Sequence, residues 1–388
     1  MEKTIFNFHD LILLTTIFQC LFFAFLIFAS KHDRKSDIFL IGFLLTQAAI
    51  PFHLLVNYGE EFRFIALEFS PNLYKIFETA YWLEGPLLLW YTRSLVYKNY
   101  QLSKTDLLYV LPFGIYLIYI TITFYSQSDI DKVDILYSHD TINASLLHHL
   151  IGFFREGLRV AFSILCLIEI KRCRQQIRNR YSSIEKIDLG WLNFLVISFL
   201  FVRAWAILVA ISIIFHVHVG IKIDFANLGL FANYATLGLV TVLIYFGIKY
   251  SSIFEGMEDD VPATQSQQTT QEIDPAIIES IEQYMQNQKP FLANILTLEQ
   301  LANQMNIAPR SLSNIINRHF KRNFFEFINE YRIEEAKSLL SNPDNKSKTI
   351  IDIMDASGFN SKATFNTFFK KLVGETPSQY RMKHKTNN

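Results

Sequence analysis

The sequence contains little cysteine and little charge. Three of its 388 residues are cysteines, Cys20, Cys166 and Cys173, and the first two lie in apolar runs. Three such positions build neither a disulfide framework nor a paired zinc site. Asp, Glu, Lys and Arg make up 19% of the chain, below the roughly 25% of soluble domains. The composition therefore excludes a small secreted scaffold and does not fit a single water-soluble fold.

Motifs that carry catalysis are also missing. The sequence has no glycine-rich phosphate-binding loop, no HExxH zinc motif and no nucleophile elbow. A histidine-kinase output is disfavoured because it would need glycine-rich nucleotide-binding segments. We therefore expect no enzyme, and neither a catalytic site, a metal site nor a cofactor.

Apolar residues are abundant, and they form long runs before residue 250. Residues 1–250 carry 21 Lys and Arg and 19 Asp and Glu, whereas the much shorter segment 251–388 carries 15 and 17. A transmembrane helix needs about 20 mostly apolar residues. Seven stretches approach this requirement, at residues 11–30, 38–56, 73–92, 107–125, 148–170, 191–215 and 226–248. The sequence therefore predicts a domain of seven membrane spans at residues 1–250.

Two of the seven spans are weaker than the others because charged residues interrupt them. Span 73–92 contains Lys75, Glu78 and Glu84, and span 148–170 contains Arg155, Glu156 and Arg159. Basic residues in the loops give an independent test, since cytoplasmic loops are enriched in Lys and Arg. The loops after spans one, three and five hold twelve Lys or Arg, against four in the N-terminus and the remaining loops. This alternation predicts a multi-pass membrane protein with its N-terminus outside and its C-terminal part in the cytoplasm.

The segment after the last span differs in composition. Residues 255–272 hold five acidic residues and four Gln but no Lys or Arg, and so have little to bury. We expect residues 251–273 to form a flexible linker to a C-terminal domain at residues 274–388.

Residues 274–388 show a duplicated helical pattern. Apolar residues at Leu298, Leu301, Ala302, Met305 and Ile307 recur 52 positions later, with serine at the fourth position. Thr297, Thr349 and Thr376 each stand three residues before Gln or Asp, which is typical of a capping box at a helix start. After each turn a second amphipathic helix begins. The pattern predicts two helix-turn-helix units joined by a helix over residues 325–340.

Polar residues face away from the apolar stripe of each second helix. Arg, Asn and Ser pair with base edges in the major groove, whereas Lys and Arg at helix ends bind phosphates. The candidates in the first unit are Arg310, Ser311, Ser313, Asn314, Asn317 and Arg318, and those in the second are Ser361, Lys362, Ala363, Asn366, Thr367, Lys370 and Lys371. We expect the two helices to enter successive major grooves of double-stranded promoter DNA. The alternative for each side chain is simple solvation.

Several motifs near the end of the chain carry a family resemblance. They are Gly358-Phe359-Asn360-Ser361, Phe365, Phe369-Lys370-Lys371, Gly374 and the run from Thr376 to Arg381, supported by Leu301-Ala302, Pro309 to Ser313 and Tyr331-Arg332-Ile333. On these motifs residues 297–380 resemble the DNA-binding domain of the AraC/XylS transcription regulators. Regulators with seven membrane spans before this domain are a known subgroup of that family.

The resemblance implies a transcription regulator, with RNA polymerase as a partner if the protein activates transcription. The sequence departs from the family at three positions. Asn314 and Thr367 stand where the family often has Arg, which puts those two contacts in doubt. Met354 replaces a usual Ala and affects packing in the second unit.

Three charged residues are expected near the middle of the membrane, Glu84, Arg159 and Arg203 on spans three, five and six. An ionised group there is costly unless it is paired or faces a cavity. One interpretation is an internal ion pair that holds the helices together. The other is a polar pocket for a small-molecule ligand, and the two are compatible.

Together these observations predict an all-α protein that senses a ligand in the membrane and regulates transcription. Ligand binding would change helix packing or the pairing of two protomers in a homodimer, and so the posture of the DNA-binding domain. The alternatives are a transport or lipid-binding protein with an accessory DNA-binding domain, and constitutive anchoring without sensing. Substitution of Glu84 or Arg203 distinguishes them, because a sensor loses its transcriptional response whereas a transporter loses solute uptake.

Overall fold

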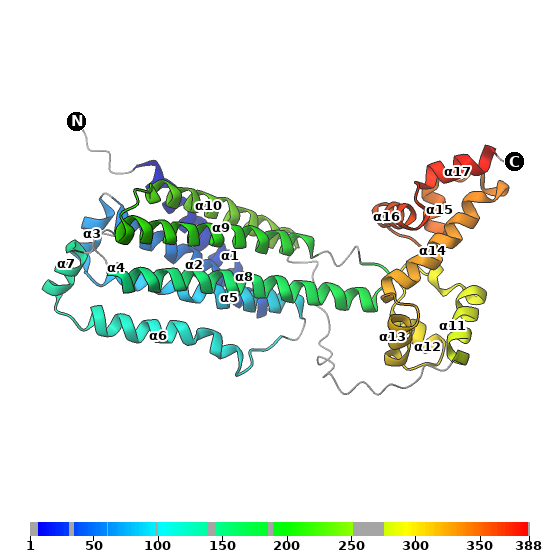
Figure 1. Ribbon diagram of the computed structural model, residues 1–388, viewed down its shortest axis with the longest axis horizontal. Coiled ribbons are helices and arrows are strands. Elements are labelled where there is room, and N and C mark those ends of the chain that lie inside the picture. Colours follow the sequence, from blue (N-terminus) through cyan, green and yellow to red (C-terminus); the bar gives the residue numbers. More distant parts are fainter. Residues whose placement is uncertain are drawn as a thin grey trace. The chain divides into compact units, whose positions relative to one another are not determined.

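The computed structural model describes residues 7–30, 35–59, 61–97, 100–138, 145–184, 189–250 and 275–386. Helices joined by turns and loops make up these residues, and they contain no strand beyond one isolated β-bridge between Tyr181 and Thr297, which confirms the predicted all-α class. The chain divides into two compact units (Figure 1). Unit 1 comprises Met1–Ile170 and Leu189–Pro262, and unit 2 comprises Lys171–Asp188 and Ala263–Asn388. The predicted linker at residues 251–273 lies outside the described residues.

Unit 1 is a bundle of long helices with shorter elements between them (Figure 1). Its elements are α1 (Phe8–Ala29), α2 (Lys35–Tyr58), α3 (Phe62–Phe69), α4 (Leu73–Ile76), η1 (Phe77–Thr79), α5 (Ala80–Val96), η2 (Asp106–Val110), α6 (Leu111–Ile120), η3 (Thr121–Tyr125), α7 (Asp129–Ser138), the first part of α8 (Leu146–Arg180), α9 (Gly190–Ile214), η4 (Phe215–Val219) and α10 (Phe225–Tyr250). Helix α2 packs against α1 and α5, and α10 packs against α1 and α9.

Five helical segments in the described part of the chain are long and apolar enough to cross a membrane. They are Phe8–Ala29, Ser36–Tyr58, Asp106–Tyr125, Gly190–Val219 and Asn227–Phe246. These segments coincide with the five stronger predicted spans, at residues 11–30, 38–56, 107–125, 191–215 and 226–248. The two weaker spans correspond to α4, η1 and α5, and to the first part of α8. Both are helical, but their charged residues make them less apolar than the other five segments, so the count of seven spans stays a prediction.

Unit 1 has apolar side chains on its outside and charged side chains inside. Phe18 and Phe25 of α1, Ile118 of α6 and Phe201 of α9 are all more than half exposed. The buried polar residues include Gln47, Glu84, Glu156, Arg159 and Arg203. A water-soluble bundle has the opposite distribution. Lipid in contact with the apolar exterior would account for it.

Unit 2 is built from short helices around one longer helix. Its elements are the last part of α8, α11 (Pro275–Gln288), η5 (Pro290–Leu292), α12 (Leu298–Gln304), α13 (Pro309–Arg318), α14 (Phe324–Ser341), η6 (Pro343–Asn345), α15 (Ile350–Ala356), α16 (Lys362–Val373) and α17 (Pro377–Thr386). In Figure 1, α11 to α13 lie at the N-terminal end of α14, and α15 to α17 lie beside its C-terminal half.

The predicted capping boxes form at the helix starts. The Thr297 side chain accepts a hydrogen bond from the Gln300 amide, and the Gln300 side chain accepts one from the Thr297 amide. Thr349 and Asp352 make the same reciprocal pair at the start of α15. The backbone amide and then the hydroxyl of Thr349 hold the pKa of the exposed Asp352 carboxyl below its ordinary value. These caps satisfy amide groups that a helix start otherwise leaves without partners.

Each helix-turn-helix unit has its own hydrophobic core, and α14 contributes to both. Ile328 of α14 packs with Leu301 and Leu312 in the first core. Ile333 and Ala336 of α14 pack in the second core, whose other members include Ile353, Phe359, Phe365 and Phe369. The predicted joining helix therefore holds the two units together through side chains on two of its faces.

Gly358 adopts a backbone conformation, and has a close neighbour, that a residue with a Cβ does not tolerate well. We expect Gly358→Ala to destabilise unit 2 by about 3 kcal/mol. Its φ is +86°, and a Cβ there would lie 2.5 Å from the Phe291 carbonyl oxygen. The left-handed conformation costs an alanine about 1 kcal/mol, and overpacking adds about 1–3 kcal/mol. Hydrogen exchange of the α15 and α16 amides in the full chain measures the loss.

Gly374 is the matched control for Gly358. Its φ is +85°, but a Cβ there would meet nothing within 4 Å. Gly374→Ala therefore carries the conformational cost alone, about 1 kcal/mol. Equal losses for the two substitutions would show that the contact with Phe291 is unimportant.

Candidate DNA-binding surface and buried charge network

The turns of the two helix-turn-helix units have the same backbone design. In the first, Asn306 adopts a φ of +53° and the Ile307 amide donates to the Ala302 carbonyl oxygen at 2.9 Å. In the second, Gly358 adopts a positive φ and the Phe359 amide donates to the Met354 carbonyl oxygen at 3.1 Å. The structural match at an interval of 52 residues shows that the sequence repeat reflects a repeated turn.

The second helices of the two units, α13 and α16, match at a different interval. Helix α13 buries Leu312, Ile315 and Ile316, and α16 buries Phe365, Phe368 and Phe369, each 53 positions later. The second turn is therefore one residue longer than the first. At this interval the predicted contact residues Ser313, Asn314, Asn317 and Arg318 correspond to Asn366, Thr367, Lys370 and Lys371.

Most of the predicted DNA-contact residues are exposed on these two helices. Those exposed are Arg310, Ser311, Asn314, Asn317 and Arg318 in the first unit and Lys362, Ala363, Thr367, Lys370 and Lys371 in the second. Ser313, Ser361 and Asn366 are half-buried. The apolar face of each helix packs in the core, so the opposite face carries polar and basic groups toward solvent, as binding in a major groove requires.

Several of the predicted residues also make contacts within unit 2. The Ser361 hydroxyl caps α16 by accepting from the Thr364 amide at 3.3 Å. The Asn317 amide group donates to the Ser313 carbonyl oxygen at 2.8 Å. The Lys371 ammonium lies 3.6 Å from a carboxylate oxygen of Glu326 on α14. A role for these side chains in DNA binding would have to compete with these contacts.

The helix-turn-helix units meet at a buried arginine. The sequence pattern predicts this arginine on the apolar face of the joining helix. Arg332 of α14 is 1% exposed. Its guanidinium donates to the carbonyl oxygens of Phe291 at 2.7 Å and Ala293 at 2.8 Å. It also donates to the Ser182 carbonyl oxygen and hydroxyl, each at 3.2 Å. A charged residue at a core position of an amphipathic helix was the sequence signal, but its partners could not be inferred from it.

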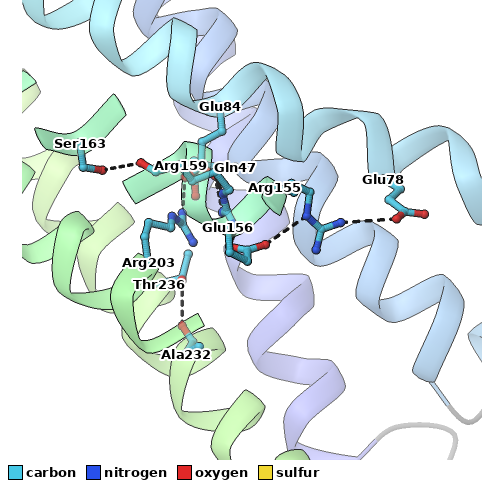
Figure 2. A network of polar contacts seen from close by, with 10 residues as sticks. All are labelled: Gln47, Glu78, Glu84, Arg155, Glu156, Arg159, Ser163, Arg203, Ala232 and Thr236. Atoms are coloured by element: carbon cyan, nitrogen blue, oxygen red, sulfur yellow. Dashed lines mark hydrogen bonds and ion pairs between the residues drawn. The ribbon is translucent and has the colours of Figure 1, made fainter. Parts of the chain in front are cut away.

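Unit 1 brings together the three charged residues predicted at mid-membrane. Glu84 of α5 forms ion pairs with Arg159 of α8 and Arg203 of α9 (Figure 2). It also accepts a hydrogen bond from the Gln47 amide of α2 at 2.8 Å. The three charged residues are at most 6% exposed. Glu84 therefore joins α5 to α8 and α9 through buried ion pairs and to α2 through a hydrogen bond.

The ion pairs continue from this centre as a chain (Figure 2). Arg159 donates to Glu156 at 2.5 Å, and Arg155 donates to Glu156 at 3.1 Å and to Glu78 at 3.4 Å. Glu78 in turn accepts from Lys75 at 3.0 Å. The sequence identified Lys75, Glu78, Arg155 and Glu156 as interruptions of the two weaker spans, but it missed that they bind one another. We call these residues, with Glu84, Arg159 and Arg203, the charge network.

A cavity of about 460 Å³ lies in unit 1 against the charge network. All four basic residues of the network line it, together with aromatic residues such as Tyr81 and Trp82. Glu78 and Glu156 also line it. Small-molecule sites are usually 300–1,000 Å³, mostly apolar, with a few converging polar groups. Over the residues that the structure describes, no group of three or more His, Cys, Asp or Glu is arranged to hold a metal ion.

Comparison with known proteins places the C-terminal part of unit 2 in a family. The helix-turn-helix domain family matches residues 301–383. The chain is 32% identical over 109 residues to the uncharacterized HTH-type transcriptional regulator YijO of Escherichia coli (strain K12), which is 28% of this chain and 36% of that protein. It is 33% identical over 86 residues to the melibiose operon regulatory protein of Escherichia coli (strain K12), 22% of this chain and 28% of that protein.

A third relative is the uncharacterized HTH-type transcriptional regulator YtdP of Bacillus subtilis (strain 168). The identity is 33% over 91 residues, which are 24% of this chain and 11% of that protein. The chain thus spans at most 36% of the length of any of these three relatives. No solved structure matches the chain. Two matched turns, two recognition helices and these relatives together establish that the chain carries a helix-turn-helix DNA-binding domain of the AraC type at its C-terminal end.

Proposed function

We propose that the protein is a membrane-embedded transcription regulator that binds promoter DNA sequence-specifically through α13 and α16. The observation that carries this proposal is the pair of recognition helices, each with a buried apolar face and a solvent-facing polar face, held on one helix, α14. The apolar exterior of the unit 1 bundle supports membrane insertion. We further propose the division into a sensor domain at residues 1–250, a linker at 251–273 and a DNA-binding domain at 274–388.

The proposed arrangement in the cell follows from the need to reach DNA. The C-terminal domain lies in the cytoplasm of a bacterium, and the N-terminus lies outside the inner membrane. Promoter DNA and the lipid bilayer are the partners, a homodimer is the proposed assembly, and RNA polymerase is a partner if the protein activates. A reporter enzyme fused at the C-terminus tests the topology, because periplasmic activity would remove the domain from the chromosome.

We expect Arg310→Ala and Asn366→Ala each to weaken binding to the operator by about 1–3 kcal/mol, with a smaller effect on random DNA. Loss of a bidentate contact to a base edge has this size, and it relaxes discrimination at one position. Genome-wide occupancy of the full chain identifies the operator, and titration of the purified chain with that fragment and with random DNA measures both affinities.

Lys337→Ala is the control for these substitutions. Lys337 lies on α14 outside the recognition helices and pairs with Glu334 at 2.7 Å. We expect no change in operator affinity beyond about 0.5 kcal/mol for this surface substitution. Equal losses on operator and random DNA for Arg310→Ala would mean that Arg310 contacts phosphate alone.

We propose that the cavity in unit 1 binds a small anion with an apolar body. The charge network holds four basic residues and three acidic ones, so it is one negative charge short. The four basic residues all line the cavity, whereas Glu84 does not. A carboxylate in the cavity would therefore meet guanidinium groups and balance the network, and aromatic walls would hold its apolar part.

Short saturated carboxylates are expected to raise the melting temperature of the full chain in lipid nanodiscs more than alcohols and amines of equal length. A ligand at about 100 times its Kd stabilises the folded state by about 2.7 kcal/mol. Arg203→Lys keeps the charge but loses the fork geometry that fits a carboxylate, so it is expected to reduce the shift. Equal shifts for the three ligand classes would contradict an anion site. Uptake of the same carboxylates, with an unchanged reporter response, would favour transport instead of sensing.

A further inference from the structure

Four residues directly after α8, Tyr181 to Ile184, are part of the folded core of unit 2; we call them the strap. Ser182 is 1% exposed. Its amide donates to the Leu296 carbonyl oxygen at 3.0 Å, and the Leu296 amide donates to the Ser182 hydroxyl at 3.0 Å. Tyr181 and Thr297 form the antiparallel bridge. The strap therefore binds the segment that leads into α12, in the first helix-turn-helix unit.

Two side chains of α14 bind the backbone of the strap. The Arg332 guanidinium donates to the Ser182 carbonyl oxygen and hydroxyl. The Asn329 amide group donates to the same carbonyl oxygen at 3.4 Å and is fully buried. A buried guanidinium is costly unless acceptors surround it. The strap supplies two of the acceptors of Arg332, so release of the strap would leave a buried charge with fewer partners.

The strap also contacts the second helix-turn-helix unit. The Ser183 hydroxyl donates to the side-chain oxygen of Asn360 at 3.0 Å. Asn360 directly precedes Ser361, the residue that caps recognition helix α16. Ile184 packs against the second hydrophobic core. The strap thus bridges the entry to α12 on one side and the entry to α16 on the other.

The strap begins at Tyr181, the residue that directly follows the last residue of α8. Helix α8 runs from Leu146 to Arg180 as one helix, and its residues 155 and 159 belong to the charge network. We propose that the strap is a built-in ligand of the DNA-binding domain, which sets the spacing of the two recognition helices and passes movement of α8 to them. This inference rests on the proposed binding of DNA by α13 and α16.

The physical reason for this role is preorganisation. A DNA site read in two successive major grooves demands one spacing of the two recognition helices. Where the spacing is already set, binding does not have to order it, and the affinity is correspondingly higher. A docked strap therefore favours a two-groove operator, and it contributes little to a fragment that only one recognition helix contacts.

Ser182→Leu in the full chain tests the docking. The added side chain has no room at a buried position and removes both hydroxyl contacts, so the strap is displaced. We expect the variant to bind the operator found by genome-wide occupancy about tenfold more weakly. We expect it to bind a half-operator, which carries the DNA sequence contacted by only one helix-turn-helix unit, less than about twofold more weakly. Ser338→Leu, at an exposed position of α14, is the control and is expected to bind both fragments normally.

Two outcomes of this experiment would overturn the proposal. One is unchanged operator binding by Ser182→Leu. The other is an equal loss on operator and half-operator, which would mean that the strap serves general stability alone. If the unsubstituted chain occupies no DNA at all, the proposed function fails instead, so the two failures are distinguishable.

Alanine insertions after Ile170 test the coupling without disturbing the strap itself. Each residue inserted in a helix rotates the part of the chain after it by about 100° and moves that part by about 1.5 Å. We expect insertion of one or two alanines to change reporter transcription about fivefold or more. Four alanines rotate the following segment to within about 40° of its original direction, so we expect them to restore most of the normal transcription. Insertions that act without this periodicity, or not at all, would refute the coupling.

The last connection between the units provides the matched control. The same alanines inserted within residues 251–273 are expected to change reporter output less than about twofold, because the composition of that segment predicts a flexible linker. An equally strong effect of insertions at both places would mean that distance between the units, and not the orientation of α8, determines the output.

Discussion

Glu84→Gln is expected to destabilise unit 1 by about 3–5 kcal/mol, because it leaves Arg159 and Arg203 buried with their shared counterion removed. The glutamine has the same shape, so packing is unchanged and the loss reports charge. The Gln47 amide, which donates to Glu84, keeps an acceptor in the variant. Thermal unfolding of the full chain in lipid nanodiscs measures the effect.

Glu334→Gln is the matched control in the same chain. Glu334 pairs with Lys337 at 2.7 Å, but the Glu334 side chain is 67% exposed. An exposed pair contributes about 0–1 kcal/mol, so this substitution is expected to be nearly neutral. The double substitution Glu84→Gln with Arg203→Gln removes one positive charge as well and is expected to recover part of the loss. Equal effects of Glu84→Gln and Glu334→Gln would show that the charge network does not stabilise the bundle.

Arg332→Met is expected to destabilise unit 2 by about 3–5 kcal/mol and to abolish operator binding at physiological temperature. Methionine fills similar space, but it cannot donate to the carbonyl oxygens of Phe291, Ala293 and Ser182. Each buried acceptor left without a donor costs about 1–3 kcal/mol. Hydrogen exchange of the amides of α12 and α15, together with operator titration, measures both consequences.

Arg322→Met is the control for this substitution. Arg322 pairs with Glu330, and its side chain is 44% exposed. Its loss is expected to cost less than about 1 kcal/mol. If Arg332→Met unfolds unit 2 no more than Arg322→Met does, the junction between the helix-turn-helix units depends on apolar packing alone.

Local sequence patterns determined most of the elements. The five long apolar helices, the capping boxes at Thr297 and Thr349 and the apolar faces of α13 and α16 were all predictable. Each of them depends on residues within a single helix or at its start, where hydropathy, helical periodicity and caps act. The family resemblance at residues 358–381 depends on a short run in the same way.

The two weak spans show where local patterns stop. Glu84 and Glu78 make α5 and its entry less apolar, and Arg155 and Arg159 do the same to α8. Taken alone, each charge counts against a membrane helix. The structure pairs them across 75 or more residues of sequence, so charges that weaken the separate helices join them in the bundle. Hydropathy measures one helix at a time and cannot include that pairing.

The sequence by itself determined that the chain has an apolar helical half and a duplicated helix-turn-helix half, because composition, periodicity and capping act within single helices. The tertiary structure alone decided which charges of different helices neutralise one another. It also decided that the residues after α8 lie against Arg332, 150 positions later. Contacts over such separations depend on how the helices pack, and a buried charge finds its partners only when that packing is complete.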